Sequence, residues 1–249
     1  MKFPDHFSGV ASDYAAFRPQ YPAELFEWLA SVCSRHDLAW DCACGSGQAS
    51  ASLASHFGRV VGTDASPTQV AAAEATETTQ FVVAASEQTP LADNTIDLVA
   101  VAAALHWFAD EPFFAEVGRV VRPGGVFAAW SYGMPHIDSE DVESVVHGFI
   151  DGLLGPYWPP QIRMVLDGYA SIVLPFEELD SPSFDLEAEW TLERFLGFAR
   201  TWSGVGRYIE DLGEDPVLNL VAELEEAWRD EEGLLPIRYR LDLRVGRIS

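Results

Sequence analysis

The sequence is poor in positive charge. Its 249 residues contain 39 aspartates and glutamates but only 15 lysines and arginines, so the formal net charge is -24 at pH 7. Lys2 is the only lysine. A chain with this charge repels phosphate backbones and anionic lipid headgroups. We therefore expect neither a nucleic acid nor a membrane surface as its partner.

Cysteines and long apolar runs are also scarce. The three cysteines, Cys33, Cys42 and Cys44, are odd in number, which argues against a disulfide framework and favours a reducing compartment. No second pair of Cys or His residues accompanies them to complete a metal site. No run approaches the about 18 apolar residues of a membrane span, and the first residues lack the apolar core of a signal peptide. We expect a cytoplasmic monomer or homodimer without a bound metal.

The first half of the chain contains a regular alternation of strand and helix patterns. Apolar strands are expected at 38–43, 59–64, 80–85, 96–105 and 126–133, and helices at 22–36, 46–58, 66–76 and 110–121. The connections are too short for anything but crossovers, and strands that are apolar throughout are typical of a parallel sheet covered on both faces. The pattern predicts an α/β fold with a doubly wound, mostly parallel sheet.

The second half lacks this regular alternation of strands and helices. It predicts helices at 138–154, 160–173, 191–202 and 215–233, and strands at 183–190 and 237–248. We expect the late strands to complete the same sheet. We also expect one domain over 1–249, which divides into N-terminal helices 1–36, a cofactor-binding core 37–133, a helical cap insertion at about 134–175 and C-terminal strands and helices 176–249.

The turn after the first strand is the first candidate for a ligand site. Ligands of open α/β sheets bind beyond the carboxyl ends of the strands. Gly45 and Gly47 allow close approach there, and Asp64, at the end of the second strand, is placed to accept hydrogen bonds from a ribose. The turn lacks the third glycine of a dinucleotide fingerprint and the lysine of a P-loop. A phosphate-free or cationic adenosine ligand therefore fits best; the alternative is an ordinary strand-to-helix turn with a capping aspartate.

Several stretches together resemble one family. The residues are WDCACGSGQAS, VVGTDASPTQV, the LHWF that ends the fourth strand region, and VRPGGVFAAWSYG. They are similar to class I S-adenosylmethionine-dependent methyltransferases, and within these to the type 11 group that includes trans-aconitate methyltransferase-like proteins. The resemblance implies a seven-stranded Rossmann-like methyltransferase fold. It also implies S-adenosylmethionine as cofactor, S-adenosylhomocysteine as product, and methylation of a small-molecule substrate.

The resemblance also assigns the cofactor to particular residues. They are Asp41, Ala43, Gly45 and Gly47 for the methionyl part, Asp64 for the ribose, Ala65, Ala85 and Ser86 for the adenine, and Ala102 for the surroundings of the sulfur. Two of them depart from the family pattern. Ala43 replaces a glycine, which is tolerable if its φ is negative, and Ala85 replaces an aspartate, at a cost of about 0.5 to 1.5 kcal/mol for the lost hydrogen bond.

An aromatic and cationic pair lies near the start of the chain. Tyr14 and Arg18 belong to DYAAFRPQYP, another stretch that resembles the subgroup. If this segment folds over the cofactor, Arg18 could clamp a carboxylate of the cofactor or of an acidic substrate. The alternative is a surface or capping arginine.

The acceptor side is predicted from residues near the fourth strand and the cap. His106 follows that strand and is a candidate general base, because an unperturbed histidine has a pKa near 6.5; the alternative is a structural histidine beside Trp107. The candidate substrate pocket consists of Trp107, Tyr132, Tyr157, Trp158 and Arg200. The resemblance favours a carboxylate or other oxygen nucleophile. Ala43 and Ala85 leave open a methyltransferase-fold protein that binds the cofactor without turnover.

Overall fold

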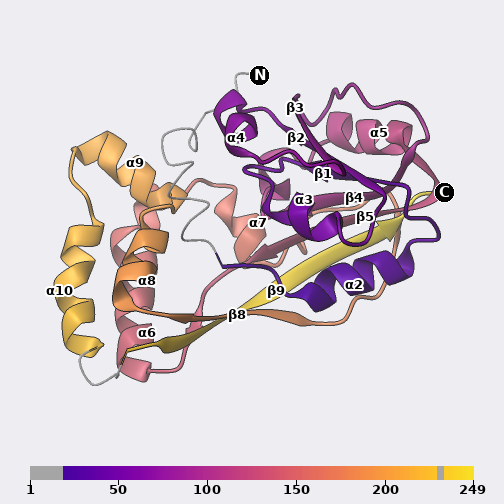
Figure 1. Cartoon of the computed structure of the whole chain (residues 1–249). Helices are drawn as coiled ribbons and strands as arrows, with labels where there is room; N and C mark the ends of the chain where they lie inside the picture. The colour runs from indigo at the N-terminus through magenta and orange to yellow at the C-terminus, as the bar shows by residue number, and fades with distance from the viewer. Residues whose placement is uncertain (1–18, 229–232) are drawn as a thin grey trace.

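A mixed β-sheet runs through the protein. The computed structural model describes residues 19–228 and 233–249 (Figure 1). Within them the sheet has nine strands in the order β3-β2-β1-β4-β5-β9-β6, and β7 and β8 also pair with β9. The strands are β1 (Leu38–Cys42), β2 (Arg59–Asp64), β3 (Thr79–Val83), β4 (Ile96–Ala102), β5 (Val121–Tyr132), β6 (His136–Ile137), β7 (Glu177–Glu178), β8 (Phe184–Trp190) and β9 (Leu235–Arg247).

Strands β1 to β5 form the parallel half of the sheet. Successive residues of β4 point to opposite faces, and both faces are buried. Leu98 belongs to the core cluster that contains residues of α2 (Ala23–Val32) and α3 (Gln48–Leu53), whereas Val99 belongs to the cluster that contains residues of α5 (Glu111–Val120). The predicted Rossmann-like fold is confirmed.

The helix starts of this half follow from local chemistry. Ser66 caps α4 (Pro67–Ala72) by accepting a hydrogen bond from the backbone N–H of Gln69, and Pro67 occupies the first turn. Asp110 caps α5 in the same way through the N–H of Phe113. Both caps lie at the carboxyl edge of the sheet, so they fix how the chain leaves β2 and β4.

Strand β9 joins the late part of the chain to the sheet. It pairs antiparallel with β5 on one side and with β8 on the other. The expectation that the late strands complete the same sheet is therefore confirmed. The sheet exceeds the expected seven strands because the two-residue strands β6 and β7 also pair with β9.

The helical cap is larger than the sequence indicates. The segment after β5 gives α6 (Glu140–His147), the π-helical η3 (Gly148–Leu153), η4 (Gly155–Tyr157) and α7 (Ile162–Leu166). The segment after β8 gives α8 (Leu192–Ala199), α9 (Ser203–Leu212) and α10 (Val217–Ala227). Since α10 packs against both α6 and α8, two separate stretches of chain build the cap. Figure 1 shows α6, α8, α9 and α10 gathered at one end of the molecule.

Two helices differ from the prediction. The helix expected at 160–173 ends at Leu166, because Gly168 and Tyr169 both have positive φ. Helix α9 was not expected, since Gly204 and Gly206 weaken its helical pattern; Gly204 leaves room for the ring of Trp158, which a Cβ would meet at 3.1 Å.

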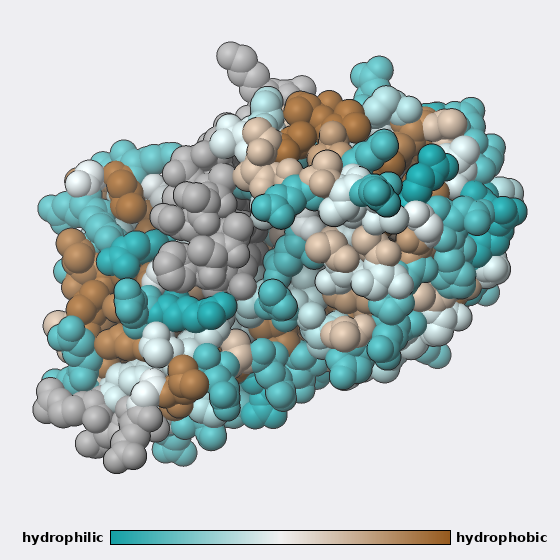
Figure 2. All heavy atoms as spheres, viewed as in Figure 1, coloured by the Kyte–Doolittle hydropathy of each residue, from teal (hydrophilic) through white to brown (hydrophobic). Residues whose placement is uncertain are grey.

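The surface facing the viewer in Figure 2 is largely hydrophilic, with apolar patches at the left edge over α9 and α10. Exposed large apolar side chains in this part of the chain are Ile209, Leu212 and Leu218. In residues 19–228 and 233–249, no helix has the length and apolar composition that a membrane crossing requires.

Candidate active site

The turn after β1 has an unusual backbone. Three of its residues have positive φ: Ala43 at 57°, Gly45 at 55° and Gly47 at 89°. The negative φ under which Ala43 would be readily tolerated is therefore not adopted. Left-handed backbone costs a residue with a Cβ roughly 1–2 kcal/mol, and such strain is often concentrated at functional sites. At Gly47 a Cβ would lie 2.7 Å from Cζ of Phe81, so that position requires glycine.

Asp41 is the most unusual carboxyl group of this turn. It is completely buried, and its Oδ2 accepts a hydrogen bond of 2.6 Å from Oγ of Ser50. Its Oδ1 is buried and has no hydrogen-bond partner among the described residues. Burial raises the pKa of Asp41 to about 7, and the charge of Asp64 acts in the same direction. A buried carboxylate oxygen of this kind fits a cationic group, such as the ammonium of a methionyl ligand.

Asp64 is fixed at the end of β2 by the backbone. Its Oδ2 accepts from the N–H of Gly45 at 2.9 Å, and its Oδ1 accepts from the N–H of Ser66 at 2.8 Å. These two bonds join the turn after β1 to the start of α4. Ala65, which lies between them, is exposed. The arrangement holds the carboxylate where the sequence predicts a ribose to bind.

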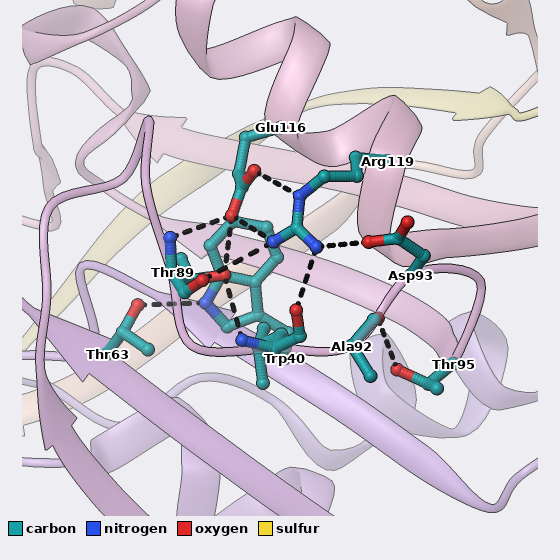
Figure 3. A network of polar contacts seen from close by, with 9 residues as sticks. Trp40, Thr63, Thr89, Ala92, Asp93, Thr95, Glu116 and Arg119 are labelled. Atoms are coloured by element: carbon teal, nitrogen blue, oxygen red, sulfur yellow. Dashed lines mark hydrogen bonds and ion pairs between the residues drawn. The ribbon is translucent and has the colours of Figure 1, made fainter.

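The loop after β3 contains Ala85 and Ser86. Ala85 forms an isolated bridge with Gln88, and Oγ of Ser86 donates to Glu87 at 3.3 Å. The next part of the loop is held by an ionic network on α5 (Figure 3).

Glu116 and Arg119 are the centre of this network (Figure 3). Oε1 of Glu116 accepts from both the N–H and the hydroxyl of Thr89, at 2.7 Å each. Arg119 pairs with Glu116 and Asp93 and donates to the carbonyl of Leu91. The hydrogen bond from Arg119 is the main reason that the pKa of Glu116 falls to about 2. The network thus ties the loop that contains Ala85 and Ser86 to α5.

A cavity of about 170 Å³ lies beyond the ends of β4 and β5. Ala102 is the last residue of β4, and Ala103, which follows with a φ of 51°, lines the cavity. His106 lines it from the short 3₁₀ helix η2 (Leu105–Trp107). Strand β4 therefore ends directly at this cavity.

The structure brings together three of the five residues expected at a substrate pocket, namely Trp107, Tyr132 and Trp158. Tyr157 packs instead against the ring of Tyr208, with centroids 4.8 Å apart, and does not line the cavity. Arg200 is exposed and pairs with Asp215 at 3.1 Å, also away from the lining.

Sequence reasoning missed several lining residues, among them Met134, Phe198 and Tyr239. Tyr239 lies on β9. The alternation of apolar and polar residues in this strand predicts one buried and one exposed face, but it does not predict that the face with Tyr239 borders the cavity. The cavity is mainly aromatic and aliphatic. Its described lining contains no lysine or arginine, and Asp151 is its only carboxylate.

His106 has a well-defined neighbour. Its Nδ1 lies 3.0 Å from the hydroxyl of Tyr169, and its ring centroid lies 4.8 Å from that of Trp107. Tyr169 is fully buried, and burial raises its pKa well above the usual value. The phenol is therefore neutral at physiological pH. Tyr14 and Arg18, which were also predicted at the site, lie outside the described residues.

The chain was also compared with known proteins. A family model described as a methyltransferase domain matches residues 40–129. A Dictyostelium discoideum protein named as a methyltransferase is 32% identical over 235 residues, which are 93% of this chain and 89% of its own. A Saccharomyces cerevisiae protein named as an S-adenosylmethionine-dependent methyltransferase is 26% identical over 92% of this chain and 91% of its own.

A solved structure is also similar to this chain over most of its length. It is that of a protein from Anaeromyxobacter dehalogenans named as a type II methyltransferase, which is 39% identical. The two structures superimpose with a TM-score of 0.84 over 93% of this chain and 98% of the other. The likeness therefore extends across the parallel strands, β9 and the cap.

Proposed function

The chain belongs to the class I S-adenosylmethionine-dependent methyltransferases, and we propose that it methylates a hydroxyl group on a small, uncharged, largely apolar acceptor. The observation that carries this proposal is the position of His106 on the wall of an apolar cavity at the end of β4. When bound, the cofactor supplies an electrophilic methyl group on a sulfonium.

The residues of the first two strand ends fit the cofactor. Oδ1 of Asp41 is a buried acceptor without a partner among the described residues, which suits the cofactor's ammonium group. Two backbone N–H groups hold Asp64 at the end of β2, which supports its proposed role as partner of the ribose. Ala65, Ala85, Ser86 and Ala102 complete the proposed adenine and sulfur surroundings.

The cavity suits an acceptor of about one aromatic ring. Its volume is about 170 Å³, and an engineered protein cavity of about 150 Å³ is large enough to hold benzene. Trp107, Tyr132 and Trp158 present flat apolar surfaces to it. The indole N–H of Trp158 donates to the carbonyl of Ile150 at 2.9 Å, which holds that wall in place.

His106 is the proposed base. An acceptor hydroxyl is a weak nucleophile until it loses its proton, and a histidine within hydrogen-bond reach can take that proton. The acceptor oxygen then forms a bond to the methyl carbon while the bond from that carbon to sulfur breaks. The proton remains on the imidazole and later passes to water. The products are the methyl ether and S-adenosylhomocysteine.

The position of His106 supports a hydroxyl over a carboxylate. The resemblance favours a carboxylate or other oxygen nucleophile, and a carboxylate would need a cation to offset the net charge of -24. The described part of the lining contains no lysine or arginine, while Arg18, the predicted partner of a carboxylate, lies outside the described residues. A carboxylate is also already ionised and would leave His106 without a proton to remove. The acidic chain also favours a small molecule over a nucleic acid.

The test is a transfer assay with matched acceptors. Small phenols and benzoates of the same size are incubated with the protein and S-adenosylmethionine, and methylated products are measured by mass spectrometry. We expect methylation of phenols and a loss of roughly 100-fold or more in His106→Gln, as for removal of a general base. His36→Gln, at the opposite end of the sheet, is the matched control. Methylation of benzoates alone would contradict the proposal.

A further inference from the structure

Five aromatic rings form a continuous wall of the cavity. Each ring contacts the next, at centroid distances between 5.2 and 6.3 Å, in the order Tyr132, Tyr239, Phe198, Trp202 and Trp158. All five residues line the cavity. Because the faces of aromatic rings carry partial negative charge, this aromatic wall attracts a cation and repels an anion.

Asp151 is the only carboxylate in the described lining of this cavity. It follows Ile150 in η3, and its exposure places it where the cavity meets solvent. No hydrogen bond or ion pair ties its side chain to another residue within 19–228 and 233–249. The carboxylate is therefore available to a ligand that enters the cavity.

The helix that carries Asp151 has a wide turn. The N–H of Leu154 donates at 3.0 Å to the carbonyl of Phe149, five residues earlier, as in a π-helix. The indole N–H of Trp158 donates to the carbonyl of Ile150 at 2.9 Å. Turns of this kind occur frequently at functional sites. These two hydrogen bonds hold the backbone around Asp151 and connect it to the aromatic wall.

No cationic side chain in the described lining offsets this carboxylate. The lining contains no lysine or arginine there, and its other group that ionises near neutral pH is His106, at the end of the sheet. The chain as a whole has a net charge of -24. An anion in the cavity therefore meets repulsion from Asp151, an uncharged molecule meets none, and a cation is attracted.

We propose that Asp151 is a specificity-determining residue that, together with the aromatic wall, selects ligands of the cavity by the sign of their charge. Anionic acceptors are excluded by repulsion, whereas uncharged acceptors enter without it. Small organic ammonium ions bind more tightly than uncharged molecules of the same shape and compete with the acceptor. The proposal rests on the proposed function in one respect, namely that this cavity is the acceptor site.

The test measures binding and needs no methyl transfer. Three probes share one branched shape, namely the cation choline, its uncharged carbon analogue neohexyl alcohol, and the anion tert-butylacetate. Their dissociation constants are measured by ligand-observed NMR titration with S-adenosylhomocysteine present, at low ionic strength and about pH 8, where an unperturbed histidine is neutral. We expect choline to bind roughly 10-fold more tightly than tert-butylacetate, with the alcohol between them. Salt should reduce this difference, because it screens an exposed carboxylate.

Asp151→Asn removes the charge and keeps the shape of the side chain. The variant should lose about 3-fold of the preference for choline over tert-butylacetate and bind neohexyl alcohol as the wild type does. Asp141→Asn removes the same charge from an exposed position of α6 outside the lining. As the matched control, it should leave all three affinities unchanged.

Several results would overturn the proposal. In the wild-type protein they are equal binding of the three probes, tighter binding of tert-butylacetate, or no binding of choline at tens of millimolar. In Asp151→Asn the contradicting result is an unchanged preference for choline. Failure of the acceptor proposal is distinguishable, because the expected order of binding without methylation of phenols would reject only the hydroxyl acceptor. Methylated phenols with a cavity that does not distinguish the probes would reject only the selection by charge.

Discussion

At the residue scale, the turn after β1 combines two features that oppose stability. Ala43 has a φ of 57°, and Asp41 is a fully buried carboxyl group. Both lie where the cofactor's methionyl part is proposed to bind. A site that is costly in the free protein is common where a ligand supplies the missing interactions.

The strain at Ala43 predicts a stabilising substitution. In Ala43→Gly the steric cost of the left-handed conformation disappears, which stabilises the folded state. This gain is larger than the loss of stability that comes from the greater conformational freedom of glycine in the unfolded chain. We expect the free energy of unfolding to rise by about 0.5 to 1 kcal/mol in urea denaturation. Ala51→Gly, at an exposed position of α3, is the matched control and should lower it by about 1 kcal/mol. A loss of stability in Ala43→Gly would show that the Cβ is needed for packing.

The raised pKa of Asp41 predicts a pH-dependent effect. The pKa is about 7 in the folded protein and 3.8 for an ordinary aspartate, so between these values the folded state binds more protons than the unfolded state. The contribution of Asp41 to the free energy of unfolding therefore falls as the pH rises from about 4 to 7.

Asp41→Asn removes this contribution. The variant should gain stability relative to wild type at about pH 8, and the gain should shrink at about pH 4.5, as measured by urea denaturation. Calorimetry should show weaker binding of S-adenosylhomocysteine, because an amide cannot pair with an ammonium. A stability difference that does not change with pH would reject the assignment.

The residue scale also shows what the sequence can and cannot predict. His106 was predicted at the acceptor side because it directly follows a strand of a parallel sheet. Its neighbour Tyr169 could not be paired with it, because the contact depends on a left-handed turn that β9 enforces from more than 70 residues away. The φ of Ala43 could not be predicted from the sequence either, because alanine normally has a negative φ and adopts a positive one only where its surroundings require it.

At the element scale, the loop after β3 depends on α5. Removing Arg119, whose side chain is 37% exposed, leaves the buried carboxylate of Glu116 without its ionic partner, at a cost of about 1–2 kcal/mol because solvent screens part of the interaction. Arg119→Ala should therefore lower the free energy of unfolding by about that amount. It should also speed hydrogen exchange in residues 85–95 and weaken binding of S-adenosylhomocysteine. Arg35→Ala, which breaks an exposed pair with Asp37, is the matched control and should cost less than about 1 kcal/mol. Unchanged exchange in the loop would contradict the role of the network.

The elements that the sequence predicts well are those with strong local signals. Strands β1 to β5 and helices α4 and α5 have apolar runs, caps and short connections, and each was predicted near its observed position. The cap was harder, because its packing joins α6 to α10 across some 70 residues of chain. Helix α9 was missed for a local reason, namely the two glycines near its start.

At the scale of the whole molecule, the proposed cofactor site and the acceptor cavity lie at the ends of different strands of the sheet. The ends of β1, β2 and β3 hold the proposed cofactor residues, while the ends of β4 and β5, with the cap and β9, enclose the cavity. The residues that were predicted by the family resemblance lie mainly in the first part. The acceptor side depends on how two separate stretches of cap meet, which explains why only part of it could be predicted.

The most direct measurement is a crystal structure of the protein with S-adenosylhomocysteine. We predict the ribose at Asp64, the amino group near Oδ1 of Asp41, and the sulfur facing the cavity beside Ala103 and His106. The cavity itself should remain open for an acceptor. A sulfur that points away from this cavity, or a cavity filled by the adenosine part, would contradict the account.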